Sequence, residues 1–181
     1  MPTASPISVR LLRAGDTEKA LAFELENKDW FEQWVPPRPD GYYSLDKLQQ
    51  INTALIEEAK QDTAYIHVIL NAADNIVGRI NLSEIKRRNV SSADLGYRVG
   101  KNLGEQGVAT QAVLEVIKLA AQRYDLNLLT AHCLEINPAS SAVLNKTGFK
   151  QTLKTESKIP WMSGTQTILH FERNLVRAGG A

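Results

Sequence analysis

Hydrophobic and polar residues alternate along several short segments of the chain. The first is marked by Ile7, Val9 and Leu11, whose spacing of two predicts a strand of about seven residues. The same alternation, bounded by residues that favour turns, predicts further strands over residues 65–70, 76–85, 93–99 and 128–134, followed by two strands after Phe149. Turn-forming residues separate the strands of residues 65–70, 76–85 and 93–99, so these are expected to form an antiparallel meander.

Between these strands the apolar spacing changes to that of a helix. Asp16 is placed to cap a first helix, and Ser44 to begin a second. The broadest apolar helical face starts at Val108 and ends near Tyr124. A short helix is expected over residues 138–147, because a proline opens it and Gly148 follows it.

The resulting order of elements is β-α-α-β-β-β-α-β-α-β-β, which predicts an α/β fold with a mixed sheet and helices on both faces. A chain of 181 residues is expected to form a single domain over residues 1–181, with residues 178–181 frayed at the end. The Trp- and Pro-rich segment of residues 30–39 fits neither a regular helix nor a central strand, so we expect a shaped loop there.

The overall charge excludes several classes of function. The chain has 21 Lys and Arg against 20 Asp and Glu, a balance that predicts neither nucleic acid nor a membrane surface as partner. The one tight basic run, Lys86, Arg87 and Arg88, is expected to be a solvated hairpin. No targeting segment or long apolar stretch is seen, which predicts a cytoplasmic protein.

The cysteine and histidine residues are few. The single Cys133 cannot form an intramolecular disulfide, and the three histidines are too scattered for a metal site, so no metal is expected. His132 and Cys133 are neighbours on a predicted strand and therefore point to opposite faces, which disfavours a catalytic Cys–His pair. A buried thiol is expected instead.

A glycine-spaced turn leads from the strand of residues 93–99 into the helix that starts at Val108. Gly104 and Gly107 allow the backbone to approach a ligand closely, and the helix N-terminus favours an anion such as phosphate. The spacing of these glycines matches neither the dinucleotide fingerprint nor the P-loop, which argues against NAD and nucleoside triphosphates.

The residues of this turn, Gly104-Glu105-Gln106-Gly107-Val108-Ala109, resemble the acetyl-CoA loop [QR]-x-x-G-x-[GA] of the GNAT superfamily of N-acetyltransferases, with Gly104 in place of Gln or Arg. Residues 137–149 match a second element of that family, N-x-x-[SA]-x-x-[VL]-x-x-K-x-G-F, position for position. Residues 93–97 and 34–36 resemble the ribosomal-protein-alanine (RimJ/RimL-like) branch.

This resemblance implies a sheet of about seven mostly antiparallel strands, in which the parallel strands 4 and 5 splay apart. It also implies that acetyl-CoA is the co-substrate. Its pyrophosphate would lie on Gly104, Glu105, Gln106, Gly107, Val108, Ala109 and Thr110. Its pantetheine arm would lie along the backbone of Tyr97, Arg98 and Val99, beside Asn137, and Lys146 would meet a CoA phosphate.

The implied reaction is attack by a neutral amine on the acetyl thioester, for which a carboxylate is a suitable proton acceptor. Glu84 and Asp94 are the first candidates because their strands flank the expected thioester, with Glu135 behind them. Many family members carry a Tyr to protonate the leaving thiolate, but this chain has Leu144 at that position. A hydroxyl of Ser140 or Ser141 could serve, or the thiolate could leave without an acid.

The acceptor predicted from the resemblance is a primary amine at a protein or peptide N-terminus. Acetylation of a small amine (a polyamine, an amino acid or an antibiotic) is the alternative, and a non-catalytic acyl-CoA-binding module is a third possibility. Trp34 and its aromatic neighbours could shape the acceptor site, or could simply cover the sheet. Both a monomer and a homodimer are compatible with the sequence.

Overall fold

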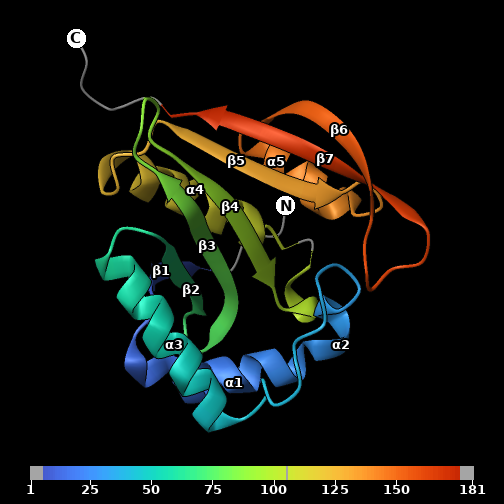
Figure 1. Cartoon of the computed structure of the whole chain (residues 1–181). Helices are drawn as coiled ribbons and strands as arrows, with labels where there is room; N and C mark the ends of the chain where they lie inside the picture. The colour runs from blue at the N-terminus through green and yellow to red at the C-terminus, as the bar shows by residue number, and fades with distance from the viewer. Residues whose placement is uncertain (1–5, 105, 176–181) are drawn as a thin grey trace.

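The computed structural model describes residues 6–104 and 106–175, and the expected fraying of residues 178–181 falls outside this part of the chain. Within it, seven strands form one sheet in the order β1-β2-β3-β4-β5-β7-β6 (Figure 1). The strands are β1 (Ile7–Leu11), β2 (Tyr65–Asn71), β3 (Ile76–Lys86), β4 (Ser92–Val99), β5 (Leu128–Leu134), β6 (Lys150–Lys158) and β7 (Thr165–Asn174).

Only one pair of neighbouring strands in this sheet is parallel. β4 pairs with β5 in parallel, whereas the other neighbours pair in antiparallel fashion. The parallel ladder covers only residues 92–94 of β4 and 128–130 of β5, and beyond it the two strands diverge (Figure 1). The predicted mixed sheet with splayed parallel strands is therefore confirmed.

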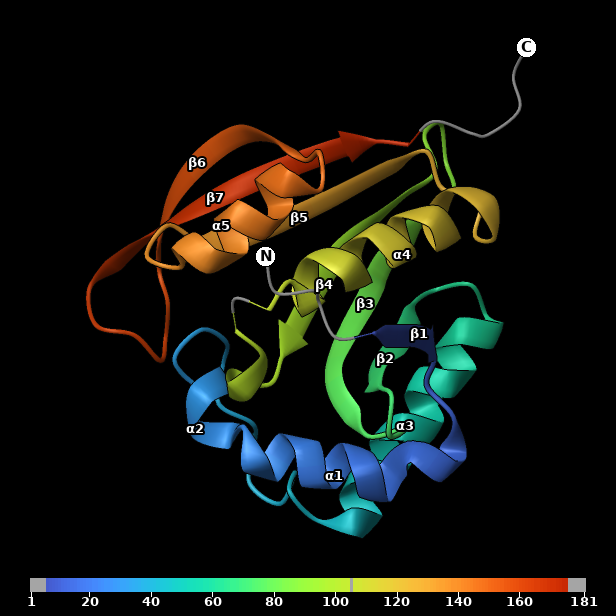
Figure 2. The same cartoon turned by 180° about the vertical axis from the view of Figure 1, so that it is seen from behind.

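Helices cover both faces of the sheet, as the sequence predicts. Helices α4 (Val108–Gln122) and α5 (Pro138–Lys146) lie together on one face, in front of β4 and β5 in Figure 2. Helices α1 (Thr17–Glu26) and α3 (Leu45–Lys60) cover β2 and β3 on the opposite face, with the short α2 (Lys28–Phe31) beside the end of β4 (Figure 1).

Each face has its own apolar core, because side chains alternate across a strand. Towards α4 and α5 the core contains Val113 and Val116 of α4, which are fully buried against Leu82 and Leu95 of the sheet. Towards α1 and α3 it contains Phe23 and Leu48 against Val68. The sheet therefore lies between two apolar cores. Among the described strands, neighbours separate between β4 and β5.

The prediction of a loop throughout residues 30–39 is wrong at its start. Trp30 and Phe31 belong to α2, and Phe31 is buried with its ring 5.5 Å from that of Phe23. The prolines that exclude a helix begin only at Pro36, so the amide of Phe31 is free to donate to the Asn27 carbonyl at 2.9 Å.

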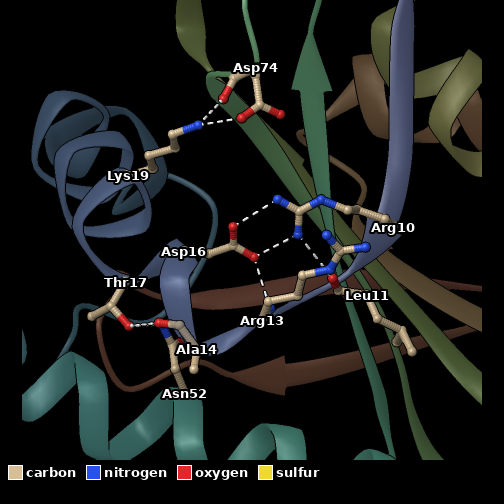
Figure 3. Close-up of polar contacts among 9 residues, drawn as sticks. All are labelled: Arg10, Leu11, Arg13, Ala14, Asp16, Thr17, Lys19, Asn52 and Asp74. Atoms are coloured by element: carbon tan, nitrogen blue, oxygen red, sulfur yellow. Dashed lines mark hydrogen bonds and ion pairs between the residues drawn. The ribbon is translucent and has the colours of Figure 1, made fainter.

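The expectation that the Asp16 side chain caps the first helix is also wrong. Asp16 immediately precedes α1, but its side chain makes no capping hydrogen bond to that helix. Instead, its carboxylate accepts two hydrogen bonds from Arg10, at 2.7 and 2.8 Å, and one from the backbone N–H of Arg13 at 2.8 Å (Figure 3). The Asp16 carboxylate is therefore engaged by Arg10 of β1 and does not cap α1.

The basic run of residues 86–88 is not entirely solvated. Arg87 donates to the Asp62 carboxylate at 2.6 Å and to the Tyr124 carbonyl at 2.8 Å. It therefore ties the β3–β4 turn to the segment after α3 and to the end of α4. Among the residues described, no helix is both long and apolar enough to cross a membrane.

Candidate active site

The opening between β4 and β5 leaves one edge of β4 without a strand partner. Residues 95–99 of β4 pair with β3 on one side, but β5 is paired on its far side with β7 and does not pair with β4 beyond Asp94. An unpaired strand edge presents backbone N–H and C=O groups to a ligand. The predicted arm-binding residues Tyr97, Arg98 and Val99 all lie on this edge.

The glycine turn lies between the end of β4 and α4. A 3-10 turn, η2 (Lys101–Leu103), follows β4, and Gly107 then occupies the N-cap position of α4 with a φ of 76°. That φ is in the left-handed region, where a glycine is favoured because it has no Cβ. No side chain caps α4 in the described structure. The predicted phosphate-binding segment therefore ends in an open helix N-terminus; Glu105 lies outside the described residues.

Within this segment the Gln106 side chain is already engaged. Its amide donates to the Asn102 carbonyl at 2.8 Å, which closes η2 onto the loop. Val108 is buried in the core, and Ala109 and Thr110 follow it in the first turn of α4. The N–H groups of this first turn are the ones that an α-helix leaves without partners inside the helix.

Three polar side chains meet on the α5 side of the opening. The Tyr97 hydroxyl lies 3.0 Å from Ser140 Oγ and 3.1 Å from the Ser140 carbonyl oxygen. Burial raises the pKa of Tyr97 to about 12, and it also raises the pKa of the neighbouring Cys133 thiol. Both groups therefore stay protonated at neutral pH, and the expectation of a buried Cys133 is confirmed.

The structure separates the two candidate serines. Ser140 contacts Tyr97 of β4, whereas Ser141, also half-buried, lies 3.5 Å from the Asn145 amide of its own helix. The hydroxyl of Tyr97 had no assigned role in the sequence, where only its backbone was expected to bind. An alternating strand pattern places Tyr97 on a face, but it cannot show which helix residue that face meets.

Residues of the second motif divide between the two ends of α5. Asn137 caps the helix through Oδ1, which accepts from the Ser140 amide at 3.1 Å, and its Nδ2 donors remain for other partners. Leu144 is buried in the core, so the position of the family's tyrosine is occupied by a packing residue. Lys146 is exposed in the last turn, roughly 13 Å along the helix from Asn137.

A polar cluster lies on the other face of the opening, where the described helices leave β5 and β7 uncovered (Figure 1). Asp94 of β4 accepts a hydrogen bond from Thr130 of β5 at 2.9 Å, and its second oxygen lies 3.7 Å from His132 Nδ1. The pKa of His132 is raised, first by its contact with Asp94 and to a smaller extent by the charge of Glu84. From the sequence, His132 was expected neither to bind a metal nor to pair with Cys133, and it had no other predicted role.

Glu84 reaches this cluster through a bulge in β3. Its φ of 51° is in the left-handed region, and the pairing of β3 with β4 shifts register between Ser83 and Lys86. After the bulge Ile85, rather than residue 84, contacts the core beside α4. A bulge redirects a side chain in this way, and it turns the two predicted carboxylates, Glu84 and Asp94, towards one face. Glu135 is instead paired with Lys154 at 2.6 Å.

A buried ionic cluster supports the far end of β4. Glu24 of α1 is 1% exposed and pairs with Arg98 and with Arg79, the latter at 3.5 Å. Burial lowers the pKa of Arg98 to about 10. Its guanidinium also lies 5.0 Å from the Phe31 ring centre, so the Arg98 side chain joins β4 to α1 and α2. Any contact of Arg98 with a cofactor is therefore through its backbone.

Trp34 follows α2 and is not part of either apolar core. Its ring is 5.9 Å from that of Trp30 in an edge-to-face arrangement, and it is half-buried. Among the residues described, no group of His, Cys, Asp and Glu side chains is arranged to hold a metal ion.

Three comparisons place the chain among known proteins. The Acetyltransferase (GNAT) domain family matches residues 7–150. A probable N-acetyltransferase from Bacillus subtilis (YjcK) is 33% identical over 144 residues, which cover 79% of this chain and 80% of the relative. The uS5 ribosomal-protein-alanine N-acetyltransferase of Escherichia coli is 22% identical over 82% of this chain and 77% of its own length.

A solved structure agrees with these matches at the level of the fold. The ribosomal-protein-S5-alanine acetyltransferase of Vibrio fischeri superposes with a TM-score of 0.87 at 20% identity, and the alignment covers 93% of each chain. The splayed strands, the glycine turn before α4 and the match over residues 7–150 lead to one conclusion. The chain belongs to the GNAT family and is an acetyltransferase that uses acetyl-CoA.

Proposed function

We propose that this acetyltransferase modifies the α-amine of a protein or peptide N-terminus, in the manner of the ribosomal-protein-alanine enzymes that it resembles. Support comes from the names of the Escherichia coli relative and of the Vibrio fischeri structure. An α-amine suits the site chemically, because its pKa of about 8 lets it lose a proton more readily than a lysine amine near 10.4. A cytoplasmic location and a single catalytic domain over residues 1–181 belong to the same proposal.

The observation that carries this proposal is the separation of β4 from β5 beyond Asp94, which exposes the β4 edge between a glycine turn and a polar cluster. The acetyl-CoA pyrophosphate would bind at residues 104–110, and the pantetheine arm along the edge of Tyr97, Arg98 and Val99 next to Asn137. The amine would then approach from the uncovered face, which carries Asp94 and Glu84.

The first experiment measures donor binding by thermal unfolding with acetyl-CoA, free CoA, NADH or ATP. A ligand at about 100 times its Kd adds about 2.7 kcal/mol, which raises the Tm of a domain of this size by roughly 5–10 °C. We expect the rise with acetyl-CoA and CoA alone. A larger rise with NADH or ATP would contradict the proposed donor residues.

The second experiment identifies the acceptor by mass spectrometry. Ala- and Ser-starting peptides are offered with acetyl-CoA, alongside the same peptides with blocked N-termini, lysine side-chain amines and spermidine. Acetylation confined to free N-terminal amines is expected. Preferential acetylation of spermidine or another small amine would replace this proposal with the small-molecule alternative.

A further inference from the structure

His132 stands where the two parallel strands separate. Thr130, two residues earlier on β5, lies opposite Asp94 in the last pair of the β4–β5 ladder. His132 follows on the same face, because side chains two residues apart in a strand share a face. The imidazole is therefore on the far side of the opening from the β4 edge along which acetyl-CoA is proposed to bind.

Asp94 is held so that one of its oxygens faces this imidazole. Thr130 Oγ1 donates to Asp94 Oδ1 at 2.9 Å, which fixes the carboxylate, and Asp94 Oδ2 lies 3.7 Å from His132 Nδ1. With Nδ1 directed to the carboxylate, Nε2 lies on the opposite side of the ring. At 3.7 Å this contact is an ion pair rather than a hydrogen bond, and it favours the ring orientation in which Nδ1 faces the carboxylate.

Exposure differs between the two groups in the way that a base and its positioning residue require. The His132 side chain is 61% exposed, whereas that of Asp94 is 23% exposed. An incoming amine can thus reach the imidazole more readily than the carboxylate. Gly96, the next β4 residue on the Asp94 face, has no atom within 4 Å of an added Cβ, so the floor beside the pair is open.

The charged and titratable groups around His132 come from three strands. Asp94 lies on β4 and Glu84 on β3, and both favour the protonated imidazole, while partial burial opposes it. His170 of β7 is directly opposite His132 in the ladder, with ring centres 6.4 Å apart. A histidine beside two carboxylates is a stronger base than a free one.

We propose that His132 is the general base of the acetyl transfer and that Asp94 positions it, rather than Asp94 or Glu84 taking the proton directly. The inference rests on the proposed reaction with an amine. A proton passes from the acceptor ammonium to His132 Nε2, and the freed nitrogen lone pair attacks the acetyl carbonyl carbon. The C–N bond forms, the C–S bond breaks, the thiolate takes the second nitrogen proton, and His132 releases its own to solvent.

The pairing is tested without any acceptor. The pKa of each histidine is measured by NMR titration in the wild-type protein and in Asp94→Asn. We expect the pKa of His132 to be above its ordinary value of about 6.5 in the wild type and to fall in Asp94→Asn. An unchanged His132 pKa in Asp94→Asn overturns the pairing, whatever the acceptor proves to be.

Proton transfer is tested through His132→Gln, with His170→Gln as the matched control. His170 is on the same face and bonds through Nε2 to Thr155 Oγ1 at 2.8 Å, but it lies one strand further from β4. In His132→Gln we expect kcat/KM at pH 7 to fall about 100-fold, the scale of general base catalysis. The affinity for acetyl-CoA and the Tm should stay at wild-type values, and His170→Gln should keep most of the activity.

The dependence of kcat/KM on pH distinguishes a base from a merely structural residue. The acidic limb set by His132 should move to lower pH in Asp94→Asn. In His132→Gln it should be replaced by a limb that follows the pKa of the acceptor amine when that amine is varied. A limb in His132→Gln at the same pH as in the wild type, unmoved by the choice of amine, would overturn the proposal and return the role to Asp94 or Glu84. If the wild type acetylates no amine in the panel, the proposed function fails, and the NMR titration still decides the Asp94–His132 pairing.

Discussion

The hydroxyl of Tyr97 lies 3.0 Å from Oγ of Ser140 and thereby joins β4 to the first turn of α5 across the opening between β4 and β5. With a pKa of about 12, Tyr97 is a poor proton donor to a thiolate, whose conjugate acid has an ordinary pKa near 8.5. It is well suited to donate a hydrogen bond. A pair of hydroxyls at this place can therefore stabilise the leaving thiolate without a tyrosine at the position of Leu144.

Loss of the Ser140 hydroxyl should slow the reaction. Removing one hydrogen-bond donor to a developing oxyanion costs about 100- to 1,000-fold in kcat. Because sulfur accepts weaker hydrogen bonds than oxygen, we expect a fall of roughly 10- to 100-fold in Ser140→Ala. The KM for acetyl-CoA should change little. Ser141→Ala is the matched control, because Ser141 contacts Asn145 instead of β4. Equal activity of the two variants would argue against a role for Ser140.

A side chain at residue 107 should weaken acetyl-CoA binding. Gly107 has a φ of 76°, where any other residue is strained by about 1–2 kcal/mol. We expect Gly107→Val to raise the Kd of acetyl-CoA at least tenfold, measured by calorimetry, because the first turn of α4 would shift. Gly15→Ala is the control, since an added Cβ there meets no atom within 4 Å. Wild-type affinity in Gly107→Val would place the donor site elsewhere.

Acid should destabilise the fold through His67. This side chain is fully buried, and its Nε2 forms a hydrogen bond of 2.8 Å with the Tyr124 hydroxyl. Burial lowers the pKa of His67 to about 4. The unfolded chain, with a histidine pKa near 6.5, binds the proton more tightly, so this stability is present above pH 6.5 and is lost as the pH falls towards 4. Linkage gives a loss of roughly 2 kcal/mol between pH 8 and pH 5.

Urea unfolding at several pH values measures this effect. His67→Phe removes the titrating group, and its free energy of unfolding should depend less on pH between 6.5 and 5 than that of the wild type. His132 contributes with the opposite sign, because its pKa is raised, but it is present in both proteins. Parallel pH dependences in the two proteins would show that His67 is not the group responsible.

Removing the charge of Glu24 should destabilise the whole domain. Glu24→Gln leaves the guanidinium groups of Arg79 and Arg98 buried without their carboxylate, and disrupting a buried pair in this way costs about 3–5 kcal/mol. Glu26→Gln, an exposed position on the same helix, should change the free energy of unfolding by less than about 0.5 kcal/mol. Similar urea midpoints for the two variants would contradict a structural role for this cluster.

Residue patterns within single segments predicted the helices and strands well. They failed where a residue of another segment took a side chain as its hydrogen-bond partner. Ser44 accepts from the Lys47 amide and caps α3 as expected. Asp16 occupies the equivalent position before α1, but the strand residue Arg10 pairs with its carboxylate. In the same way Arg87, which was expected to be solvated, donates a hydrogen bond to the Asp62 carboxylate. Arg10 is six residues from Asp16 and Asp62 is 25 residues from Arg87, and each partner lies outside the helix or strand whose pattern made the prediction.

The sequence by itself determined the alternation of strands and helices, the glycine turn at Gly107 and the α5 cap at Asn137, because these depend on side-chain spacing and backbone conformation over a few residues. The resemblance of its two motifs then identified the family. Only the tertiary structure decided which side chains meet across the opening: Tyr97 with Ser140 on one face, and Asp94 with His132 on the other. Those contacts join β4 to α5 and to β5. Their geometry depends on the residue pair at which the parallel ladder ends and on the bulge at Glu84, and both are properties of the packed sheet as a whole.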